Sequence, residues 1–436
     1  MNVRNDAKEM GQMKNSDDNT MDAAGSSAST ALFDHNLVCD EATRDPYGFF
    51  GRLRDAAPIH WNTRHKAWVL TTHELVTAAL RNTNLTADRM EPFRASVMRQ
   101  TNSAAVDETF RILASWMVFL DPPNHTRLRR LVSRIFAPSV VRAQTADIEE
   151  VVGALLADLP EGRPIDFIAE FAAPLPAIVI AKMLGVPPQD RILFKEWSDQ
   201  MTSLVFGAYD NPDRFHQAAR GMIDLRDYLL GMIEKFEVAP EDNLISLLLE
   251  QEDGDSLSRD ELISTCTLLL FGGHETTTNL ITNGLLALLE FPAQLEDLRR
   301  NPDIMSMAIE EITRFDGPAR SMVRLVKEDH EFGGVAMKAG ERVFLVNPSA
   351  NRDPAVFDDP DALNLRRNPT GHIGFGFGLH YCLGAPLARL EADLALSAVL
   401  REFASIEMAA DRSDLQWNPT MLSRGLKSLP VVLKRS

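Results

Sequence analysis

The chain has 436 residues, of which 45% are hydrophobic, and its formal net charge is −17. The apolar content is ample for a large core, while the negative charge argues against a nucleic-acid-binding surface over most of the molecule. No run of 18 apolar residues occurs in the sequence, so we expect neither a membrane span nor a membrane partner.

The first 30 residues differ from the rest of the chain. They are polar, lack helical or strand periodicity and contain no apolar segment of the kind a secretory signal needs. We predict that residues 1–30 form a disordered leader. No linker or shift of composition divides the remainder, so residues 31–436 are predicted to form a single domain.

Helical periodicity dominates the rest of the chain, and strand signals are few and short. The predicted helices are residues 45–56, 72–80, 125–136, 145–157, 167–184, 213–236, 260–289, 304–315 and 386–403. The predicted strands are residues 67–71, 335–337, 342–346 and 429–433, with a hairpin-like connection at 338–341. Because the strands cluster towards the two ends, we predict a mainly α fold with a small β region.

The helix predicted at residues 260–289 is unusually long. Ser258 stands three residues before Glu261 and forms a plausible capping box, and the first half of the helix is almost entirely apolar. Its midpoint reads Gly272-Gly273-His274-Glu275-Thr276, which combines poor helix formers with a carboxylate. A buried helix that is weakened where it carries a charge indicates a functional site.

Cys382 lies in the glycine-rich stretch GFGFGLHYCLG, residues 374–384. The three cysteines of the chain are too widely spaced for a CxxC metal site or a disulfide scaffold, which favours a reducing cytoplasm. Gly376 and Gly378 permit positive φ, so backbone N–H groups can point at one anionic sulfur, and a helix opens just after Gly384. This pattern fits an axial thiolate ligand of a macrocyclic metal; the alternative is a buried structural cysteine.

The pattern Phe375-Gly376-x-Gly378-x-His380-x-Cys382-x-Gly384 resembles the haem-binding loop of the cytochrome P450 superfamily at every defining position. The resemblance extends from about residue 31 to the end of the chain and is to the soluble bacterial branch. It implies the P450 fold, with haem b between the long helix and this loop. It also implies that Cys382 binds the haem iron and that Phe375 and Gly384 contact the cofactor.

The midpoint of the long helix matches a second motif of that family. Glu275 and Thr276 correspond to its acid–alcohol pair, which relays protons to bound oxygen in a helix that opens locally. Gly272 then lines the oxygen side of the cofactor. Asn279 and Asn283 extend the polar strip by two turns. The alternative is that the Thr276 hydroxyl only bonds its own helix.

The resemblance also implies which cations hold the haem propionates. His125 and Arg129 share one face of a helix, and Arg324 and His380 complete the set. Arg127, Arg130 and Arg134 fall on the opposite face and are interpreted either as a docking stripe for an acidic ferredoxin or as a solvated basic face. A structural trio is implied as well: Glu311, Arg314 and Arg367.

The implied reaction is a monooxygenation. One atom of O2 enters a C–H or C=C bond of a medium-sized apolar molecule such as a terpenoid, fatty acid or polyketide-like metabolite. Electrons come from NAD(P)H through a ferredoxin or flavodoxin-type partner and its reductase. Two alternatives stay open: a peroxide-dependent haem-thiolate enzyme, against which the intact Glu275–Thr276 pair argues, and a non-catalytic haem sensor or carrier.

Family topology suggests the walls of the substrate pocket. They are residues 82–105, 201–206, 268–273, 318–323 and 421–422, which are mostly apolar. Arg320 is interpreted as an anchor for a polar substrate group or as a side chain that points to solvent. His274, His372, Cys39 and Cys266 are predicted to be structural.

Overall fold

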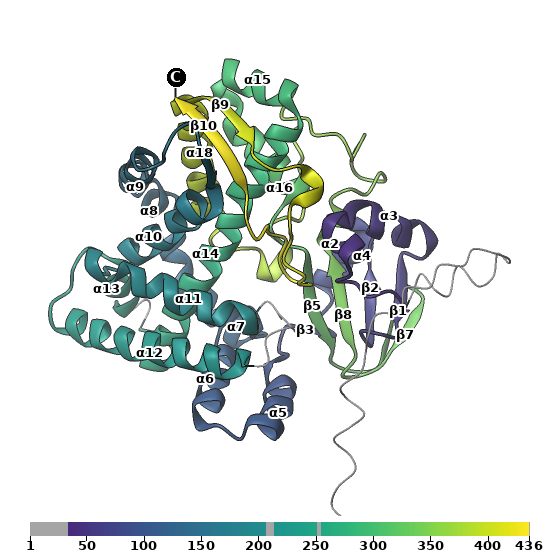
Figure 1. The fold of residues 1–436 in the computed structure, drawn as a ribbon. Helices are drawn as coiled ribbons and strands as arrows, with labels where there is room; N and C mark the ends of the chain where they lie inside the picture. Colours follow the sequence, from purple (N-terminus) through teal and green to yellow (C-terminus); the bar gives the residue numbers. More distant parts are fainter. Residues whose placement is uncertain (1–33, 206–212, 251–253, 436) are drawn as a thin grey trace, which may run out of the picture.

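The computed structural model describes residues 34–205, 213–250 and 254–435. The predicted leader, residues 1–30, lies outside the described residues, and the division into a leader and one catalytic domain stays a prediction. Figure 1 shows a large helical region beside a smaller region built on a twisted sheet. The predicted mainly α fold with a small β region is confirmed.

Helix α14 (Arg259–Glu290) runs through the helical region (Figure 1). It begins with the predicted capping box, because Ser258 accepts from the Glu261 backbone and the Glu261 side chain accepts from the Ser258 backbone. With 32 residues it is about 48 Å long. Apolar residues surround most of its circumference, so it is buried along most of its length. It packs against α10 (Pro174–Met183), α16 (Met305–Asp316) and α18 (Ala385–Glu402).

The larger sheet has the strand order β1-β2-β8-β5-β3. Its strands are β1 (Ile59–Asn62), β2 (Ala67–Leu70), β8 (Arg342–Val346), β5 (Ser321–Val326) and β3 (Leu85–Thr86), and only β2 and β8 run parallel among these pairs. Successive residues of β8 enter different cores: Phe344 packs with α2 (Asp40–Arg44) and α3 (Pro46–Ala56), whereas Leu345 packs with α4 (His73–Arg81). The sheet is therefore covered on both faces.

The predicted hairpin around residues 338–341 is wrong. Strand β7 (Val335–Met337) pairs with β6 (His330–Phe332), whereas β8 lies between β2 and β5. Four of the five residues of β8 are buried, so this strand belongs in the middle of a sheet, and Gly340 turns the chain away at φ +83°. A third sheet joins β4 (Pro164–Asp166), β10 (Pro430–Arg435) and β9 (Phe403–Met408).

Most predicted helices occur within a few residues of their expected bounds, and the differences have local causes. The stretch 167–184 is divided into a π-helix (Ile168–Ala172) and α10, because prolines at the start of α10 cannot continue the preceding helix. The stretch 125–136 becomes α7 (Asn124–Ser133) followed by a 3-10 turn. Helices that periodicity did not predict include α5 (Met90–Thr101), α6 (Ala104–Ala114) and α11 (Arg191–Val205). The remaining helices are α8 (Pro138–Ala143), α9 (Thr145–Ala157), α12 (Arg214–Val238), α13 (Leu244–Leu249), α15 (Pro292–Arg300) and α17 (Asn347–Ala350).

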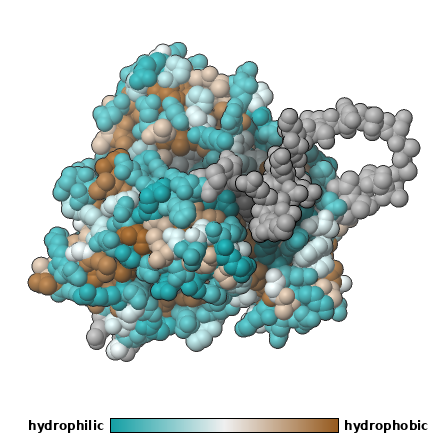
Figure 2. All heavy atoms as spheres, turned by 60° about the horizontal axis from the view of Figure 1, so that its bottom comes forward, coloured by the Kyte–Doolittle hydropathy of each residue, from teal (hydrophilic) through white to brown (hydrophobic). Residues whose placement is uncertain are grey.

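The outer surface is mainly polar. Figure 2 shows hydrophilic side chains over most of one face, interrupted by small separate hydrophobic patches. None of the helices in the described part of the chain combines the length and the hydrophobicity that crossing a bilayer requires.

Candidate active site

The loop before α18 presents Cys382. Gly376 and Gly378 adopt φ of +77° and +69°, as their spacing predicted. The Cys382 N–H donates to the Phe375 carbonyl at 2.8 Å, and the Tyr381 N–H donates to the Gly378 carbonyl at 3.1 Å. These bonds close the loop on itself and leave Cys382 exposed, in contrast to the buried Cys266.

The surroundings of Cys382 have opposing effects on the pKa of its thiol. Burial by the surrounding protein raises the pKa of this thiol, while the backbone N–H groups of Gly384 and Ala385 and the guanidinium groups of Arg129 and Arg389 lower it. Gly384 and Ala385 form the start of α18, so the donors come from a helix N-terminus. The glycines that precede the cysteine have a different task, which is to close the loop.

Helix α16 anchors the segment that leads to this loop, and the predicted trio is confirmed. Glu311 and Arg314 are both fully buried and form two hydrogen bonds of 2.8 Å, and the Nε of Arg367 donates to Glu311 at 3.1 Å. Arg314 also donates to the carbonyls of Asn351 and Pro360. One buried pair thereby fixes three segments that are distant in sequence.

Glu310, the neighbour of Glu311, was missed by the sequence analysis. Its carboxylate bonds His372 before the loop at 2.9 Å and Arg389 after the loop at 2.9 Å. The Arg389 guanidinium lies over the Phe375 ring, 4.3 Å from its centre. Burial alone would raise the pKa of Glu310, but the hydrogen bonds from His372 and Arg389 lower it to about 2. Glu310 therefore clamps both ends of the Cys382 loop, and His372 is structural, as predicted.

His125 and His380 lie in contact on one side of this loop, with ring centres 4.2 Å apart. The His125 ring is fully buried, yet neither of its nitrogens has a hydrogen-bond partner. Burial and the positive charge of Arg324 together lower the pKa of His380 to about 3. A neutral imidazole keeps one N–H donor, so two adjacent rings without acceptors in the described chain suit an anionic ligand.

Three arginines extend this cationic cluster. Arg324 on β5 is only 6% exposed, and Arg129 donates to the Tyr381 carbonyl at 2.8 Å. Arg89 was not predicted; burial lowers its pKa to about 9, and Arg324 adds to the effect. Within the described residues no carboxylate accepts a hydrogen bond from these arginines or the two histidines. Three arginines and two imidazoles that can each donate an N–H fit a ligand with two carboxylates, as haem b has.

On α14, the Thr276 hydroxyl donates to the Gly272 carbonyl at 2.8 Å, which is the alternative that the sequence left open. The predicted local opening of the helix is wrong, because α14 continues without a break through Gly272 and Gly273. The hydroxyl satisfies the carbonyl within the turn instead. A Cβ at Gly272 would meet only Leu268, at 3.8 Å, and a Cβ at Gly273 would meet nothing within 4 Å. This face of the helix is therefore open.

Glu275 has the electrostatics of a proton carrier. Burial raises the pKa of its carboxyl to about 7; the Asn279 amide one turn away opposes this rise, and the negative charge of Asp199 adds to it. Asn283, one turn further on, donates to the carbonyls of Asp316 and Arg424 at 3.1 Å. The polar strip thus begins at a titratable group and ends in structural contacts.

The arginine stripe, interpreted as a ferredoxin-docking stripe or a solvated basic face, is paired with acidic residues of the same chain. Arg127 binds Asp255 at 2.9 Å and Glu261 at 2.6 Å, Arg130 also binds Asp255, and Arg134 donates to the Glu250 carbonyl. A helical wheel identifies the shared face of these arginines but not the acidic residues that tertiary structure brings to it.

Both interpretations of Arg320 are wrong. The side chain is 2% exposed and donates to the carbonyls of Leu37, Ala42 and Thr420 at 2.6–3.0 Å. It fastens the start of the described chain to a segment near its end, and neither solvent nor a substrate can reach it.

Of the predicted pocket walls, two can be connected to the site. Arg89 lies 4.5 Å from the centre of the Phe119 ring, Phe119 stacks on Trp116, and Trp116 packs against Phe271 of α14 at 5.5 Å. This aromatic row, which the sequence analysis missed, joins the segment 82–105 to Gly272. The wall at 201–206 falls partly outside the described residues, and the walls at 318–323 and 421–422 stay predictions.

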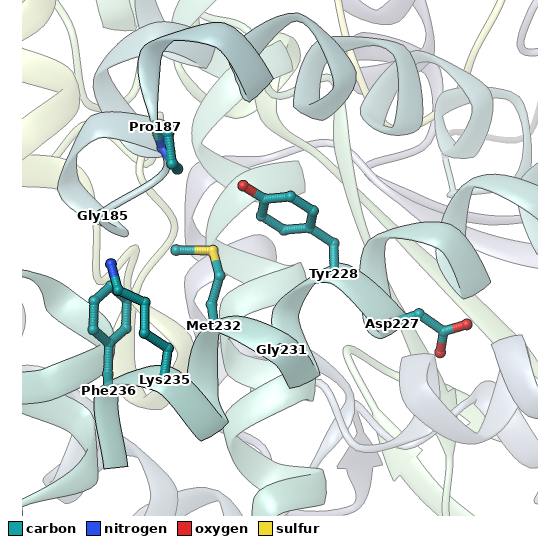
Figure 3. A pocket seen from close by; sticks show the side chains of 8 residues that line it. All are labelled: Gly185, Pro187, Asp227, Tyr228, Gly231, Met232, Lys235 and Phe236. Atoms are coloured by element: carbon teal, nitrogen blue, oxygen red, sulfur yellow. The ribbon is translucent and has the colours of Figure 1, made fainter. Parts of the chain in front are cut away.

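A separate groove lies away from these residues. Its volume is about 350 Å³, and Figure 3 shows Tyr228, Met232 and Phe236 of α12 facing Gly185 and Pro187 across it. None of its lining residues belongs to the loop, the cationic cluster or the open face of α14. It is therefore not part of the candidate active site.

The comparison with known proteins identifies the class of this fold and site. The cytochrome P450 family model matches residues 194–433. The polyketide biosynthesis cytochrome P450 PksS of Bacillus subtilis (strain 168) is 36% identical over 403 residues, covering 91% of this chain and 97% of PksS. The solved PksS structure matches with a TM-score of 0.83 at 35% identity, covering 92% of this chain and 100% of that chain. The chain belongs to the cytochrome P450 family.

Two further relatives agree with this membership. The cytochrome P450 monooxygenase PikC of Streptomyces venezuelae is 35% identical over 420 residues, covering 94% of this chain and 96% of PikC. A solved complex of P450BioI with an acyl carrier protein that bears hexadec-9Z-enoic acid matches with a TM-score of 0.83 at 33% identity, covering 90% of this chain and 99% of that chain. The chain is therefore a cytochrome P450 monooxygenase, of a family that uses haem and O2, and the predicted family and enzyme class are confirmed.

The clamp at Glu310 yields a testable prediction. Glu310→Gln should lower the free energy of unfolding at pH 7 by about 1–3 kcal/mol, because it weakens charge-assisted bonds at both ends of the loop. Since the folded-state pKa lies below the usual value, this stability is present above about pH 4.5 and is lost as the pH falls towards 2. Urea unfolding of the haem-loaded protein at several pH values measures it.

Glu296→Gln is the matched control. Glu296 forms an exposed pair with Arg300 one turn away, so its loss should change stability by less than about 1 kcal/mol. Equal effects of the two substitutions at pH 7 would show that Glu310 does not act as a clamp.

Proposed function

We propose that this cytochrome P450 holds haem b through Cys382 and oxygenates a medium-sized apolar molecule, with electrons from NAD(P)H that arrive through a ferredoxin or flavodoxin-type partner. The observation that carries the proposal is the convergence of Cys382 with three arginines and two histidines that donate to no carboxylate of the described chain. A thiolate ligand and two propionates are what such a site can hold.

Each group has a role in holding the cofactor. The Cys382 sulfur binds the iron, and the N–H groups of Gly384 and Ala385 stabilise its negative charge. His125, Arg129, Arg324 and His380 hold the two propionates, with Arg89 beside them. The Phe375 carbonyl accepts from the Cys382 N–H and so fixes the backbone that carries the sulfur. Gly272, which has no side chain, leaves room on the opposite side of the cofactor.

The haem supplies the activation of O2, and the protein supplies protons. With a pKa of about 7, the Glu275 carboxyl is present in both protonation states near neutral pH, as a proton carrier must be. Thr276 Oγ is free to exchange its bond to the Gly272 carbonyl for one to a substrate oxygen. When Thr276 Oγ gives its proton to that oxygen, Glu275 would replace it and would then take a new proton from solvent.

An apolar substrate with an extended chain fits the walls of the site. The row Phe119–Trp116–Phe271 offers aromatic surface next to Gly272. Met322 of β5 lies against the Cys382 loop, since its sulfur would be 3.6 Å from a Cβ at Gly376. The names of PksS and of the P450BioI complex refer to a polyketide and to a carrier-borne fatty acid. We therefore place fatty acyl and polyketide-like molecules ahead of terpenoids.

The electron donor is proposed to dock at the Cys382 loop and not on the arginine stripe. Leu379 and Tyr381 are exposed there, at 42% and 37%, and Arg81 lies over Phe377 of the same loop. Apolar side chains with an adjacent cation suit an acidic partner, and this is the shortest path to the sulfur. A cytoplasmic location, where NAD(P)H is available, goes with this proposal.

A substrate titration tests the substrate class. Fatty acids, macrolide-like compounds and terpenoids are added to the ferric protein while the Soret band is recorded. Fatty acids or macrolide-like compounds should displace water from the iron and shift the band from low to high spin. A shift with terpenoids alone would overturn the order given above, and no shift with any class would point to a carrier-bound substrate.

Cys382→Ser tests the iron ligand. We expect the variant to lose the red-shifted Soret band of the reduced carbon monoxide complex, because a hydroxyl donates far less electron density to iron than a thiolate. Cys266→Ser is the control: Cys266 is buried on α14 and should leave the band in place. An unchanged band in Cys382→Ser would disprove the assignment.

Thr276→Ala tests the proton route and the alternatives to a monooxygenase. With NADH and a surrogate ferredoxin and reductase, the variant should consume electrons but release peroxide in place of product, because the hydroxyl that carries protons is gone. Thr276→Ser keeps the hydroxyl and should keep most of the coupling. Unchanged coupling in Thr276→Ala would remove this residue from the route, and absence of electron-driven product in the wild type would favour a peroxide-dependent enzyme or a sensor.

A further inference from the structure

His274 precedes Glu275 on α14 and is 5% exposed. Its Nδ1 lies 3.1 Å from the hydroxyl oxygen of Ser198, a residue of α11 that is 1% exposed. The ring also forms a hydrogen bond with the backbone of Ala173, at the junction of the π-helix and α10. One side chain thus connects α14 to two other segments beside the proposed proton carrier.

The chemistry of the ring determines which way these bonds run. Burial lowers the pKa of His274 to about 4, so the imidazole is neutral at physiological pH and has one donor and one acceptor nitrogen. A backbone carbonyl can only accept, so the ring N–H donates to Ala173. Nδ1 then accepts the Ser198 hydroxyl. Both nitrogens are satisfied, and the bond to Ser198 fixes α11 in one register.

Charged groups stand next to this contact. Asp199 follows Ser198 on α11 and forms an ion pair with Lys195 at 2.6 Å, with both side chains at least one third exposed. The charge of Asp199 acts on both His274 and Glu275, and that of Lys195 acts on His274. On α14 itself, the Asn279 amide lies one turn from Glu275 and lowers the pKa of its carboxyl. The register of α11 therefore decides which solvent-exposed charges lie beside Glu275.

We propose that His274 is a positioning residue for proton delivery: its bond to Ser198 holds α11 against α14 so that Asp199 and Lys195 connect solvent to Glu275. The inference rests on the proposed roles of Glu275 and Thr276. Thr278 provides a contrast on the same face of α14. Its hydroxyl donates to the Ala172 carbonyl at 3.2 Å, so this bond connects α14 to the π-helix and not to α11.

Two amide substitutions of His274 separate its two bonds. An asparagine amide reaches the position of Nδ1, so His274→Asn can still accept the Ser198 hydroxyl but loses the bond to Ala173. A glutamine amide reaches the position of Nε2, so His274→Gln keeps a donor for Ala173 and loses the bond to Ser198. Ser198→Ala removes the latter bond from the other side. Thr278→Val is the control that removes a buried bond of α14 elsewhere.

The readout is product formed per NADH consumed, measured against pH with dodecanoic acid, or with the compound of the titration above that gives the largest spin-state shift. We expect Ser198→Ala and His274→Gln to lower this ratio by about fivefold, the factor that the loss of one neutral hydrogen bond gives. The alkaline limit of the pH profile should move to lower pH, because the negative charge of Asp199 no longer raises the pKa of Glu275. His274→Asn should retain most of the ratio. The double variant Ser198→Ala/His274→Gln should lose no more than either single variant, because both substitutions remove the same bond.

The control separates positioning from simple stability. Thr278→Val should lower the melting temperature without moving the pH profile. The inference is overturned if Ser198→Ala forms as much product per NADH as the wild type, whether or not its melting temperature falls. It is also overturned if His274→Asn and His274→Gln give the same ratio. The carbon monoxide band is recorded first for every variant: a missing band in the wild type would reject the proposed function, whereas a normal band with unchanged profiles would reject only the role of His274.

Discussion

The buried pair Glu311–Arg314 is the constraint on which the Cys382 loop depends. Two charges at zero exposure cost desolvation energy, and that cost is offset only when every donor and acceptor is used. Here the remaining guanidinium donors meet the carbonyls of Asn351 and Pro360, and Arg367 adds a third charge. Removing one member would leave a bare buried charge. The pair therefore permits only one arrangement of α16 and the chain that runs to the loop, and Glu310 on the next position holds the loop itself.

In the cationic cluster, unlike the Glu311–Arg314 pair, the cost of burying the charged groups is not offset by partners within the described chain. Burial opposes charge on His125, His380 and Arg324, and neighbouring arginines oppose it on the two histidines, whereas Asp121 favours it on all three. Because burial has the largest effect on each group, the cluster does not stabilise the folded chain by itself. A ligand with two carboxylates reverses this balance, because it binds the folded cluster and not the separated residues of the unfolded chain. If haem binds here as proposed, cofactor binding would contribute the stability that a paired cluster would give by itself.

The sequence was sufficient where the relevant residues are close together along the chain. The capping box of α14, the positive φ of Gly376 and Gly378 and the Glu311–Arg314 spacing all follow from local rules, and the structure has each of them. Contacts between distant segments were not accessible in this way. Arg320 meets carbonyls almost 300 residues away, and Arg127 meets Asp255 across 128 residues. Glu310 had no local signal, because its partners precede and follow a loop some 60–80 residues later.

Helix geometry explains how three consecutive residues of α14 acquire three different tasks. Successive side chains are rotated by about 100°, while residues four apart share a face. His274 and Thr278 accordingly both reach residues 172–173, Glu275 shares a face with Asn279, and Thr276 bonds back to Gly272. These are three adjacent stripes: one fixes the helix to its neighbours, one holds a titratable carboxyl, and one borders the open face. A shift of one residue in this register would exchange the anchoring stripe with the carboxyl stripe, so the position of α14 against α11 and α10 and the position of Glu275 are one and the same constraint.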